Sequence, residues 1–308
     1  MLSDECVSIH RCGASLVPQY PRLQMVSENR WLNIFCMEQV WIRQLYANLI
    51  NFHHLSSMTM HDKKVLAIIP ARFASTRFPG KPLVDLGGKP MIQRTYERVC
   101  SVDGWCRVVI ATDDLEIKQV AESFGAEVIM TRTDHISGTD RCAEVLEIIG
   151  EEMDYVVNIQ GDEPFIEPAQ LLELAGGFQT NAPILTLIKK IQDQATLFSV
   201  NTPKVVINSK GEALYFSRQT IPYLRGIEES EWLNRHTFYK HIGLYAYRAD
   251  VLRQLSQLKP TSLELAESLE QLRWLENAYT IQTIETQFET VGIDSPEDLE
   301  KIAKMGLI

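Results

Sequence analysis

The pattern of apolar and polar residues predicts that strands and helices alternate between residues 64 and 159. Short apolar runs that are typical of buried strands lie at residues 64–69, 107–111, 127–130 and 155–159. Apolar residues at helical spacing follow three of these runs, at residues 89–100, 116–124 and 138–149. This alternation predicts βαβ units and a mostly parallel sheet flanked by helices. Ligands of such a sheet bind beyond the carboxyl ends of its strands.

The pattern changes after residue 180. Strands are predicted with few helices between them, at residues 184–191, 204–208, 213–217 and 241–247. A helix over 263–277, a strand over 280–285 and a last helix that starts within 294–299 complete the chain. The predicted fold class is therefore α/β, with a mostly parallel sheet flanked by helices and a mixed or antiparallel β extension.

Residues 1–60 differ from the rest of the chain. They contain no lysine, and four arginines balance four acidic residues, so the remaining residues carry all of the net charge of −10. No charged segment followed by an apolar one indicates a signal peptide, whereas a transit peptide stays open. We expect an N-terminal extension that is disordered or not native, with the natural protein starting near Met60 and an over-extended reading frame before it.

The composition of the chain argues against some classes of binding partner and site. A net charge of −10 over 308 residues argues against binding to a nucleic acid, which usually needs a broad basic face. No apolar run approaches the 18 residues of a membrane span. The six cysteines form no Cys-x-x-Cys pair, so neither a disulfide framework nor a cysteine metal site is expected, and a reducing compartment is the default.

A segment rich in cationic and hydroxyl side chains, residues 70–82, directly follows the first predicted strand. Arg72 and Arg77 can each bind phosphate oxygens through two hydrogen bonds, and Lys81 supplies a compact positive charge. A Walker A motif is excluded, because Lys81 is followed by proline rather than by Ser or Thr. The segment is predicted to bind a small polyanion, and a solvated basic loop is the alternative.

Two carboxylates are candidate magnesium ligands. Asp162 follows the strand at 155–159 and is expected to face the cationic segment. Mg²⁺ prefers few protein carboxylates together with phosphate oxygens, which suits this position. Asp294 is the second candidate. A turn-capping role for Asp162 and an N-cap role for Asp294 remain the alternatives.

Segment 134–141 combines small, hydroxyl and charged side chains before a predicted helix, and it can read a base or a ribose. An ordinary N-cap at Ser137 or Thr139 is the alternative, and His135 is interpreted as a structural hydrogen-bonding residue. A carboxylated, hydroxyl-rich substrate is a candidate ligand for residues 217–218 and 241–245, and a structural role for each of these segments is the alternative. A row of acidic residues lies along one side of the predicted helix at 263–277 and is compatible with a solvated face; its members are Glu264, Glu267 and Glu270.

Together these motifs resemble the 3-deoxy-manno-octulosonate cytidylyltransferase family, from about residue 64 to the C-terminus. The matching segments, in order, are residues 69–83, 111–113, 134–141, 157–164, 213–222, 241–245, 269–273 and 291–299. The ordered set is far more specific than any one motif. Residues 1–60 have no counterpart in the family.

The resemblance implies transfer of CMP from CTP to the anomeric hydroxyl of 3-deoxy-manno-octulosonate (Kdo), with release of pyrophosphate, for lipopolysaccharide biosynthesis. It also implies Mg²⁺ as cofactor, a cytoplasmic location and a homodimer. The implied catalytic domain is 61–308, with a nucleotide-binding core at about 64–180 and 280–308 and a sugar-binding and dimerisation part at about 181–279.

The resemblance also assigns residues to roles. The triphosphate is assigned to Arg72, Ser75, Arg77 and Lys81, the rest of the nucleotide to Ser137, Arg141 and Gln160, and magnesium to Asp162 and Asp294. Catalysis is assigned to Lys81, Asp162 and Asp294. The Kdo site is assigned to Arg218, His241, Tyr245, Glu264 and Gln271.

Three positions depart from the family pattern, in which Gln, Glu and Trp are commoner; they are Ile136, Asp140 and Tyr223. Two other functions stay open. One is a cytidylyltransferase that acts on a nonulosonic acid or on a Kdo analogue such as the 8-amino sugar. The other is a non-catalytic nucleotide-binding regulator, although the presence of Lys81, Asp162 and Asp294 together argues against it.

Overall fold

The computed structural model describes residues 60, 62–74, 78–289, 292–293, 295–304 and 306. All of them belong to one compact unit, which spans residues 50–308. The predictions for residues 1–59 lie outside the described residues, and so do those for Ser75, Arg77 and Asp294. The division of residues 61–308 into a nucleotide-binding core and a sugar-binding part stays a prediction.

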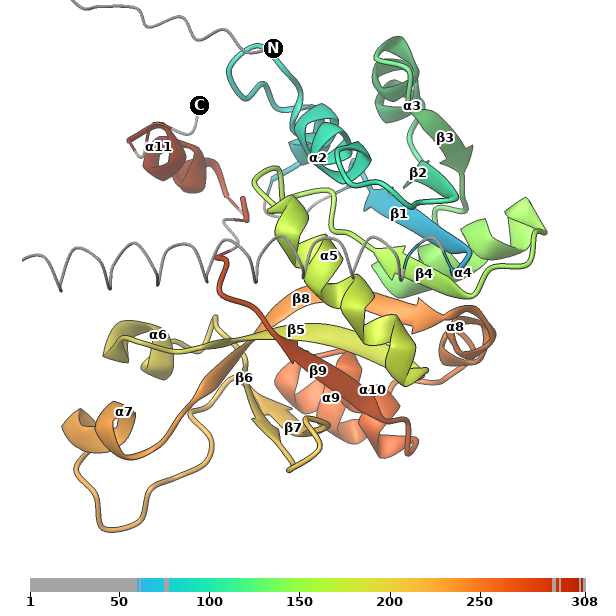
Figure 1. The fold of residues 1–308 in the computed structure, drawn as a ribbon. Coiled ribbons are helices and arrows are strands. Elements are labelled where there is room, and N and C mark those ends of the chain that lie inside the picture. Colours follow the sequence, from blue (N-terminus) through green and yellow to red (C-terminus); the bar gives the residue numbers. More distant parts are fainter. Residues whose placement is uncertain are drawn as a thin grey trace, which may run out of the picture. The chain divides into compact units, whose positions relative to one another are not determined.

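Four parallel strands form the first half of the sheet (Figure 1). They are β1 (Val65–Ala71), β2 (Arg107–Thr112), β3 (Glu127–Met130) and β4 (Tyr155–Asn158). Their order is β3-β2-β1-β4, and each neighbouring pair is parallel, as the sequence pattern predicted. The carboxyl ends of β1 and β4 therefore lie beside each other at one edge of the sheet.

The second half of the sheet is mixed. Strand β8 (Tyr239–Arg248) runs antiparallel to both β4 and β5 (Ile184–Lys190), and β9 (Ile281–Glu285) is parallel to β5. A hairpin of β6 (Lys204–Ile207) and β7 (Ala213–Ser217) joins the sheet through pairing of β6 with β8. The predicted antiparallel extension is confirmed, and β8 is the strand that joins it to the parallel half.

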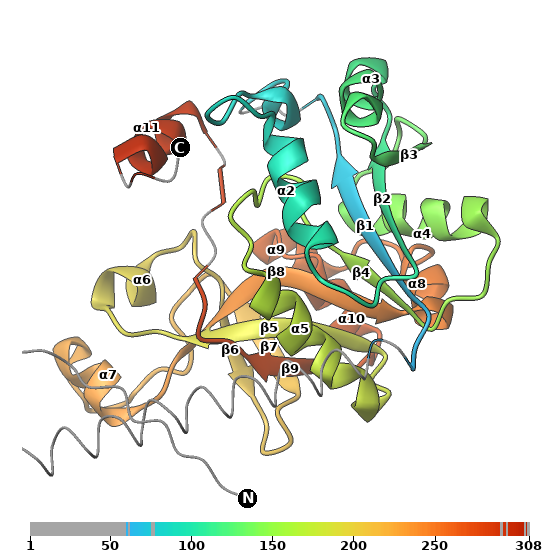
Figure 2. The ribbon, with the colours of Figure 1, turned by 45° about the horizontal axis from the view of Figure 1, so that its top comes forward.

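Helices cover both faces of the sheet (Figure 2). One face carries α2 (Met91–Cys100), α3 (Leu115–Ser123) and α5 (Pro168–Gly176), and the other carries α4 (Gly138–Ile149), α8 (Ala249–Leu255) and α10 (Gln271–Glu276). Side chains of β1 alternate between the two cores: Val65, Ala67 and Ile69 face the first group of helices, and Leu66 and Ile68 face the second. Burial on both faces explains why β1 reads as a continuous apolar run.

Further helical segments complete the described fold. They are η1 (Lys81–Leu83), η2 (Gly177–Thr180), α6 (Gln194–Phe198), η3 (Glu229–Glu231), α7 (Trp232–Arg235), α9 (Ser262–Glu267) and α11 (Pro296–Lys304). The prediction of one continuous helix over 263–277 is wrong. Ser268 has φ 52°, a left-handed conformation that ends α9, and α10 starts only at Gln271.

Candidate active site

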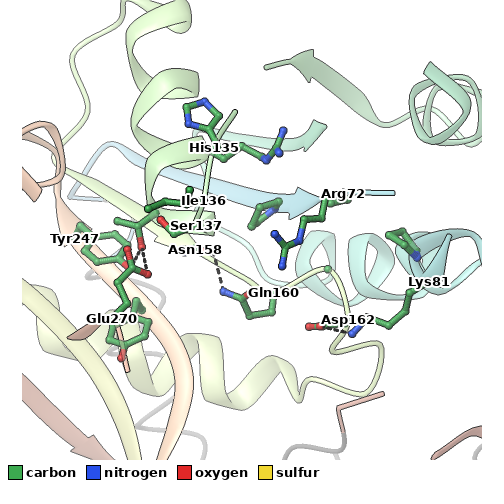
Figure 3. Close-up of a pocket in the computed structure, with 18 residues that line it drawn as sticks. Arg72, Lys81, His135, Ile136, Ser137, Asn158, Gln160, Asp162, Tyr247 and Glu270 are labelled. Atoms are coloured by element: carbon green, nitrogen blue, oxygen red, sulfur yellow. Dashed lines mark hydrogen bonds and ion pairs between the residues drawn. The ribbon is translucent and has the colours of Figure 1, made fainter. Parts of the chain in front are cut away.

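A cavity of about 360 Å³ lies beyond the carboxyl ends of β1 and β4 (Figure 3). The segments that follow these strands form its walls, together with the start of α4 and part of β8. The site residues predicted from sequence that line it are Arg72, Lys81, Ser137, Arg141, Gln160, Asp162 and Tyr245. These seven residues come from segments that are up to 173 positions apart, namely from Arg72 to Tyr245, and the sheet brings them to one edge.

One end of the cavity carries a paired cation and carboxylate. Lys81 Nζ lies 2.6 Å from Asp162 Oδ2 and also donates to the carbonyl oxygen of Ile293 at 2.8 Å. The backbone N–H of Ile293 in turn donates to the carbonyl of Asp162 at 3.2 Å. The next residue in the sequence after Ile293 is Asp294. Ile293, which precedes the second predicted magnesium ligand in the sequence, is therefore hydrogen-bonded to the first one, Asp162.

Close backbone packing fixes the position of Asp162. A Cβ atom on Gly161 would lie 2.8 Å from the carbonyl oxygen of Pro70, which is closer than packed atoms approach. Glycine thus lets the segment after β4 lie directly against the end of β1. Arg72, two residues after Pro70, is exposed and lines the same part of the cavity. Among the described residues, none buries this guanidinium, so it is accessible to a polyanion.

The start of α4 forms the middle of the cavity. The Ser137 hydroxyl accepts a hydrogen bond from the backbone of Asp140 at 3.1 Å, so the N-cap interpretation of Ser137 is confirmed. Arg141 is buried and donates to Asp113 Oδ2 at 3.0 Å and to the Thr131 hydroxyl. Its guanidinium is thereby held by two groups at the ends of β2 and β3. We infer that Arg141 shapes the cavity wall as well as lining it.

The opposite end of the cavity is polar, with a single carboxyl group whose pKa is shifted. Burial raises the pKa of Glu270 to about 7. Its Oε2 accepts from the Thr139 hydroxyl at 3.1 Å, and its Oε1 is buried without a hydrogen-bond partner among the described residues. The hydroxyl of Tyr245 is likewise buried without such a partner. Polar atoms left in this state favour a ligand that supplies hydroxyl groups.

Sequence reasoning missed Glu270 as a site residue. The row of Glu264, Glu267 and Glu270 was compatible with a solvated face, which requires one continuous helix. The turn at Ser268 instead separates Glu270 from α9 and directs it into the cavity (Figure 3). Helical spacing contains no signal for such a turn, because serine rarely adopts the left-handed conformation. The solvated-face alternative is therefore wrong for Glu270.

Two of the residues predicted to bind the sugar acid, Arg218 and His241, make hydrogen bonds within the protein. Arg218 Nε donates to the carbonyl oxygen of Glu267 at 2.7 Å. The ring of His241 is hydrogen-bonded to the Thr186 hydroxyl at 3.1 Å, and burial lowers its pKa to about 3, so the ring is neutral. Neither Arg218 nor His241 is among the described residues that line the cavity. Their sugar-binding roles stay predictions.

Glu264 is also engaged inside the protein. Both of its carboxylate oxygens accept hydrogen bonds from the guanidinium of Arg273, Oε2 from Nε at 2.7 Å, and both side chains are largely buried. Gln271 is buried as well, and its Nε2 has no hydrogen-bond partner among the described residues. Glu264 and Gln271 do not appear among the described residues that line the cavity, and their predicted roles remain untested.

Comparisons with known proteins identify the family. A model of the cytidylyltransferase family matches residues 66–304. A protein named 3-deoxy-manno-octulosonate cytidylyltransferase from Cytophaga hutchinsonii is 56% identical over 239 residues, covering 77% of this chain and 96% of the relative. A protein of the same name from Parabacteroides distasonis is 57% identical over 244 residues, with the same coverage of both chains. The chain belongs to the 3-deoxy-manno-octulosonate cytidylyltransferase family.

Solved structures agree with this assignment. The structure of a CMP:2-keto-3-deoxy-manno-octonic acid synthetase complexed with CTP is 45% identical and has a TM-score of 0.73, covering 79% of this chain and 99% of the other. A 4-diphosphocytidyl-2C-methyl-D-erythritol synthase from Anaerococcus prevotii shares the fold, with a TM-score of 0.54 at 13% identity. The predicted fold class and the prediction of a nucleotidyltransferase are confirmed.

Within this cytidylyltransferase, the donor chemistry at Asp162 fits a hard divalent cation. Its side chain is about one-third exposed, at 35%, and its carboxylate oxygens face the cavity beside Lys81. The described residues contain no group of three or more His, Cys, Asp or Glu that could hold a metal by themselves. Mg²⁺ is usually held by one or two carboxylates together with phosphate oxygens and water, which suits a site with this donor set. Among the described residues, no helix is long and apolar enough to cross a membrane.

Proposed function

We propose that this cytidylyltransferase transfers CMP from CTP to the anomeric hydroxyl of 3-deoxy-D-manno-octulosonate. The observation that carries the proposal is one cavity with two different ends: Lys81 beside Asp162 at one, and Glu270 with Tyr245 at the other. The first end suits a polyphosphate and the second suits a hydroxyl-rich sugar acid. Relatives over 50% identical and named for this activity support it.

The reaction needs little covalent chemistry from the protein. The sugar hydroxyl releases its proton and attacks the α-phosphorus, a new P–O bond forms, and the bond from the α-phosphorus to the bridging oxygen breaks as pyrophosphate leaves. Catalysis of such a transfer is mostly alignment and stabilisation of charge on the phosphate oxygens. Lys81 is suited to this role because its ammonium group is held in a fixed position by Asp162 and Ile293. Arg72 is exposed beside it and can bind the leaving pyrophosphate.

Mg²⁺ is part of the proposal. Asp162 would hold it, together with Asp294, which follows the segment that contacts Lys81. A bound Mg²⁺ would neutralise phosphate charge and acidify the attacking hydroxyl. The homodimer, the cytoplasmic location and a place in lipopolysaccharide biosynthesis are predictions from the family resemblance.

The sugar acid is proposed to bind near Glu270. At neutral pH a carboxyl group with a pKa of about 7 is partly protonated, so it can donate a hydrogen bond to a substrate oxygen and repels an anionic sugar less than an ionised carboxylate does. Thr139 holds one oxygen of this carboxyl group. The side chain is thus oriented while its other oxygen stays available.

Product analysis with a panel of sugar acids tests the proposal. The full-length protein is incubated with CTP, Mg²⁺ and either Kdo, its 8-amino analogue or a nonulosonic acid, and CMP-sugar and pyrophosphate are quantified. We expect equal amounts of CMP-Kdo and pyrophosphate, and loss of both when a chelator removes the metal. The Lys81→Met variant is expected to release neither product.

Each other outcome changes a different part of the proposal. Product formation only with the 8-amino sugar or a nonulosonic acid would retain cytidylyl transfer but refute the choice of Kdo. CTP binding without pyrophosphate release for any sugar would refute catalysis and favour a nucleotide-binding regulator. Full activity in the presence of chelator would refute the magnesium requirement.

A further inference from the structure

The end of segment 132–137 forms part of the wall of the candidate active-site cavity. This segment connects β3 to α4, and it has a cavity on each side: His135 and Ile136 line both the candidate active site and a second cavity of about 630 Å³. Ile136 is 68% exposed. The Ile136 side chain therefore gains little from packing, whereas the His135 side chain is only 5% exposed and makes a partly buried hydrogen bond that can set where the segment lies.

Those hydrogen bonds converge on Glu144, on the second turn of α4. Its Oε2 accepts from the backbone N–H of Arg132 at 2.9 Å and from Nε2 of His135. Burial opposes ionisation, but these two hydrogen bonds together lower the pKa of Glu144. An ionised carboxylate only accepts, so the His135 ring must present Nε2–H to it. Both ends of the turn from Arg132 to His135 are thereby tied to one helix.

The tie acts on residues that do line the active-site cavity. Glu144 itself is not among the described residues that line it, whereas Ile136 and Ser137 directly follow His135 and do. Ser137 is fixed by its own N-cap hydrogen bond to α4. Ile136 lies between Ser137 and His135, so these two hydrogen-bonded neighbours set its position.

We propose that Glu144 is a positioning residue, which holds segment 132–137 in the place where Ile136 and Ser137 contact the nucleotide. It acts through His135 and the backbone of Arg132 rather than by touching the substrate. The identity of the nucleotide rests on the function proposed above. The hydrogen-bonded tie between Glu144 and the segment does not.

Three variants of α4 test this. Glu144→Ala removes both hydrogen bonds, and we expect the KM and the Kd for CTP to rise about tenfold while kcat stays within about threefold. Glu144→Gln keeps an amide oxygen that can accept both, so CTP affinity should stay within about threefold of the wild type. Glu147→Ala is the matched control, because Glu147 is an exposed carboxylate on the next turn of α4 and should leave the KM unchanged.

A second measurement needs no substrate. Amide hydrogen exchange over residues 132–137, read by mass spectrometry without nucleotide, should accelerate in Glu144→Ala but not in Glu144→Gln or Glu147→Ala. Unchanged exchange and CTP affinity in Glu144→Ala would overturn the proposal, as would a Glu144→Gln variant as impaired as Glu144→Ala. If the wild type fails to use CTP, the function above is wrong, and the exchange experiment still decides the role of Glu144.

Discussion

Lys81 Nζ and Asp162 Oδ2 lie 2.6 Å apart although 81 positions separate them in the chain. The pair exists because the segments that follow β1 and β4 leave the sheet side by side. Lys81 is 8% exposed, so its ammonium group is held by Asp162 and Ile293 rather than by solvent. This geometry places a fixed positive charge and a carboxylate at the same end of the cavity.

Asp162→Asn should lower turnover by roughly 100-fold or more without unfolding the protein. The amide keeps the size of the side chain but loses the charge that orients Lys81 and suits a metal ion, and loss of one such electrostatic contact typically costs this much. Steady-state kinetics with CTP and Kdo measure the loss, and thermal melting followed by circular dichroism checks the fold. Asp103→Asn, at an exposed carboxylate outside the cavity, is the control. Near-normal turnover in a folded Asp162→Asn variant would contradict the assignment.

Two glycines that line the cavity should respond differently to alanine. In Gly161→Ala the new Cβ would lie 2.8 Å from the carbonyl of Pro70, so the segment that carries Asp162 must move. In Gly138→Ala the nearest atom is 3.4 Å away, an ordinary contact. We expect kcat/KM to fall at least about tenfold for Gly161→Ala, as displacement of a catalytic group by about 1 Å does, and to change little for Gly138→Ala. Equal effects in the two variants would show that the close approach has no role.

Stability should depend on pH through Glu270. Burial raises its pKa from 4.5 to about 7, so the folded state binds this proton more tightly than the unfolded state. The stabilising contribution is complete below about pH 4.5 and is lost as the pH rises through 7. Relative to Glu270→Gln, the wild type should lose on the order of 3 kcal/mol of unfolding free energy across this range. Urea denaturation at several pH values measures the difference, and parallel pH profiles for the two proteins would disprove the shift.

The ion pair between Glu264 and Arg273 should matter for stability rather than for binding of the sugar acid. Their side chains are 12% and 3% exposed, so Glu264→Ala leaves a buried guanidinium without its carboxylate. Removal of one partner of a buried pair typically costs about 3–5 kcal/mol. Urea denaturation should show this loss, and the double variant with Arg273→Met should lose less than the sum of the two single changes. A raised KM for Kdo with unchanged stability would instead support the sugar-binding role predicted from the family resemblance.

The elements best predicted from sequence are those with a strong local pattern. Helix α4 and strand β7 have the predicted bounds. Caps mark the ends of the helix, and an apolar pattern within each segment marks its extent. Helix α5 went unpredicted, although Glu167 and Gln170 form a capping box at its start. Its buried apolar residues, Leu171, Leu174 and Ala175, do have helical spacing, but the helix is only nine residues long, so the pattern covers little more than two turns.

Local chemistry also led to most of the lining of the cavity. The cationic residues follow one predicted strand, and Gly161-Asp162 follow another. When two such parallel strands are neighbours, the segments that follow them lie side by side. Arg218 and His241 show the limit of this reasoning. Their residue types suit a sugar acid, but Arg218 donates to the carbonyl oxygens of Glu267, Val200 and Ser268, and the ring of His241 is hydrogen-bonded to Thr186. No sequence pattern indicates such partners.

By itself the sequence determined the α/β class through its periodicity, and the resemblance of its ordered motifs to a known family implied a nucleotidyltransferase, because both are properties of the chain read along its length. Only the tertiary structure decided that β8 inserts beside β4 and that Glu270 enters the cavity. The physical reason is that strand order depends on which buried faces match across long separations, and that the turn at Ser268 depends on the packing around it. The pKa of Glu270 follows from that burial, so it too is a property of the fold.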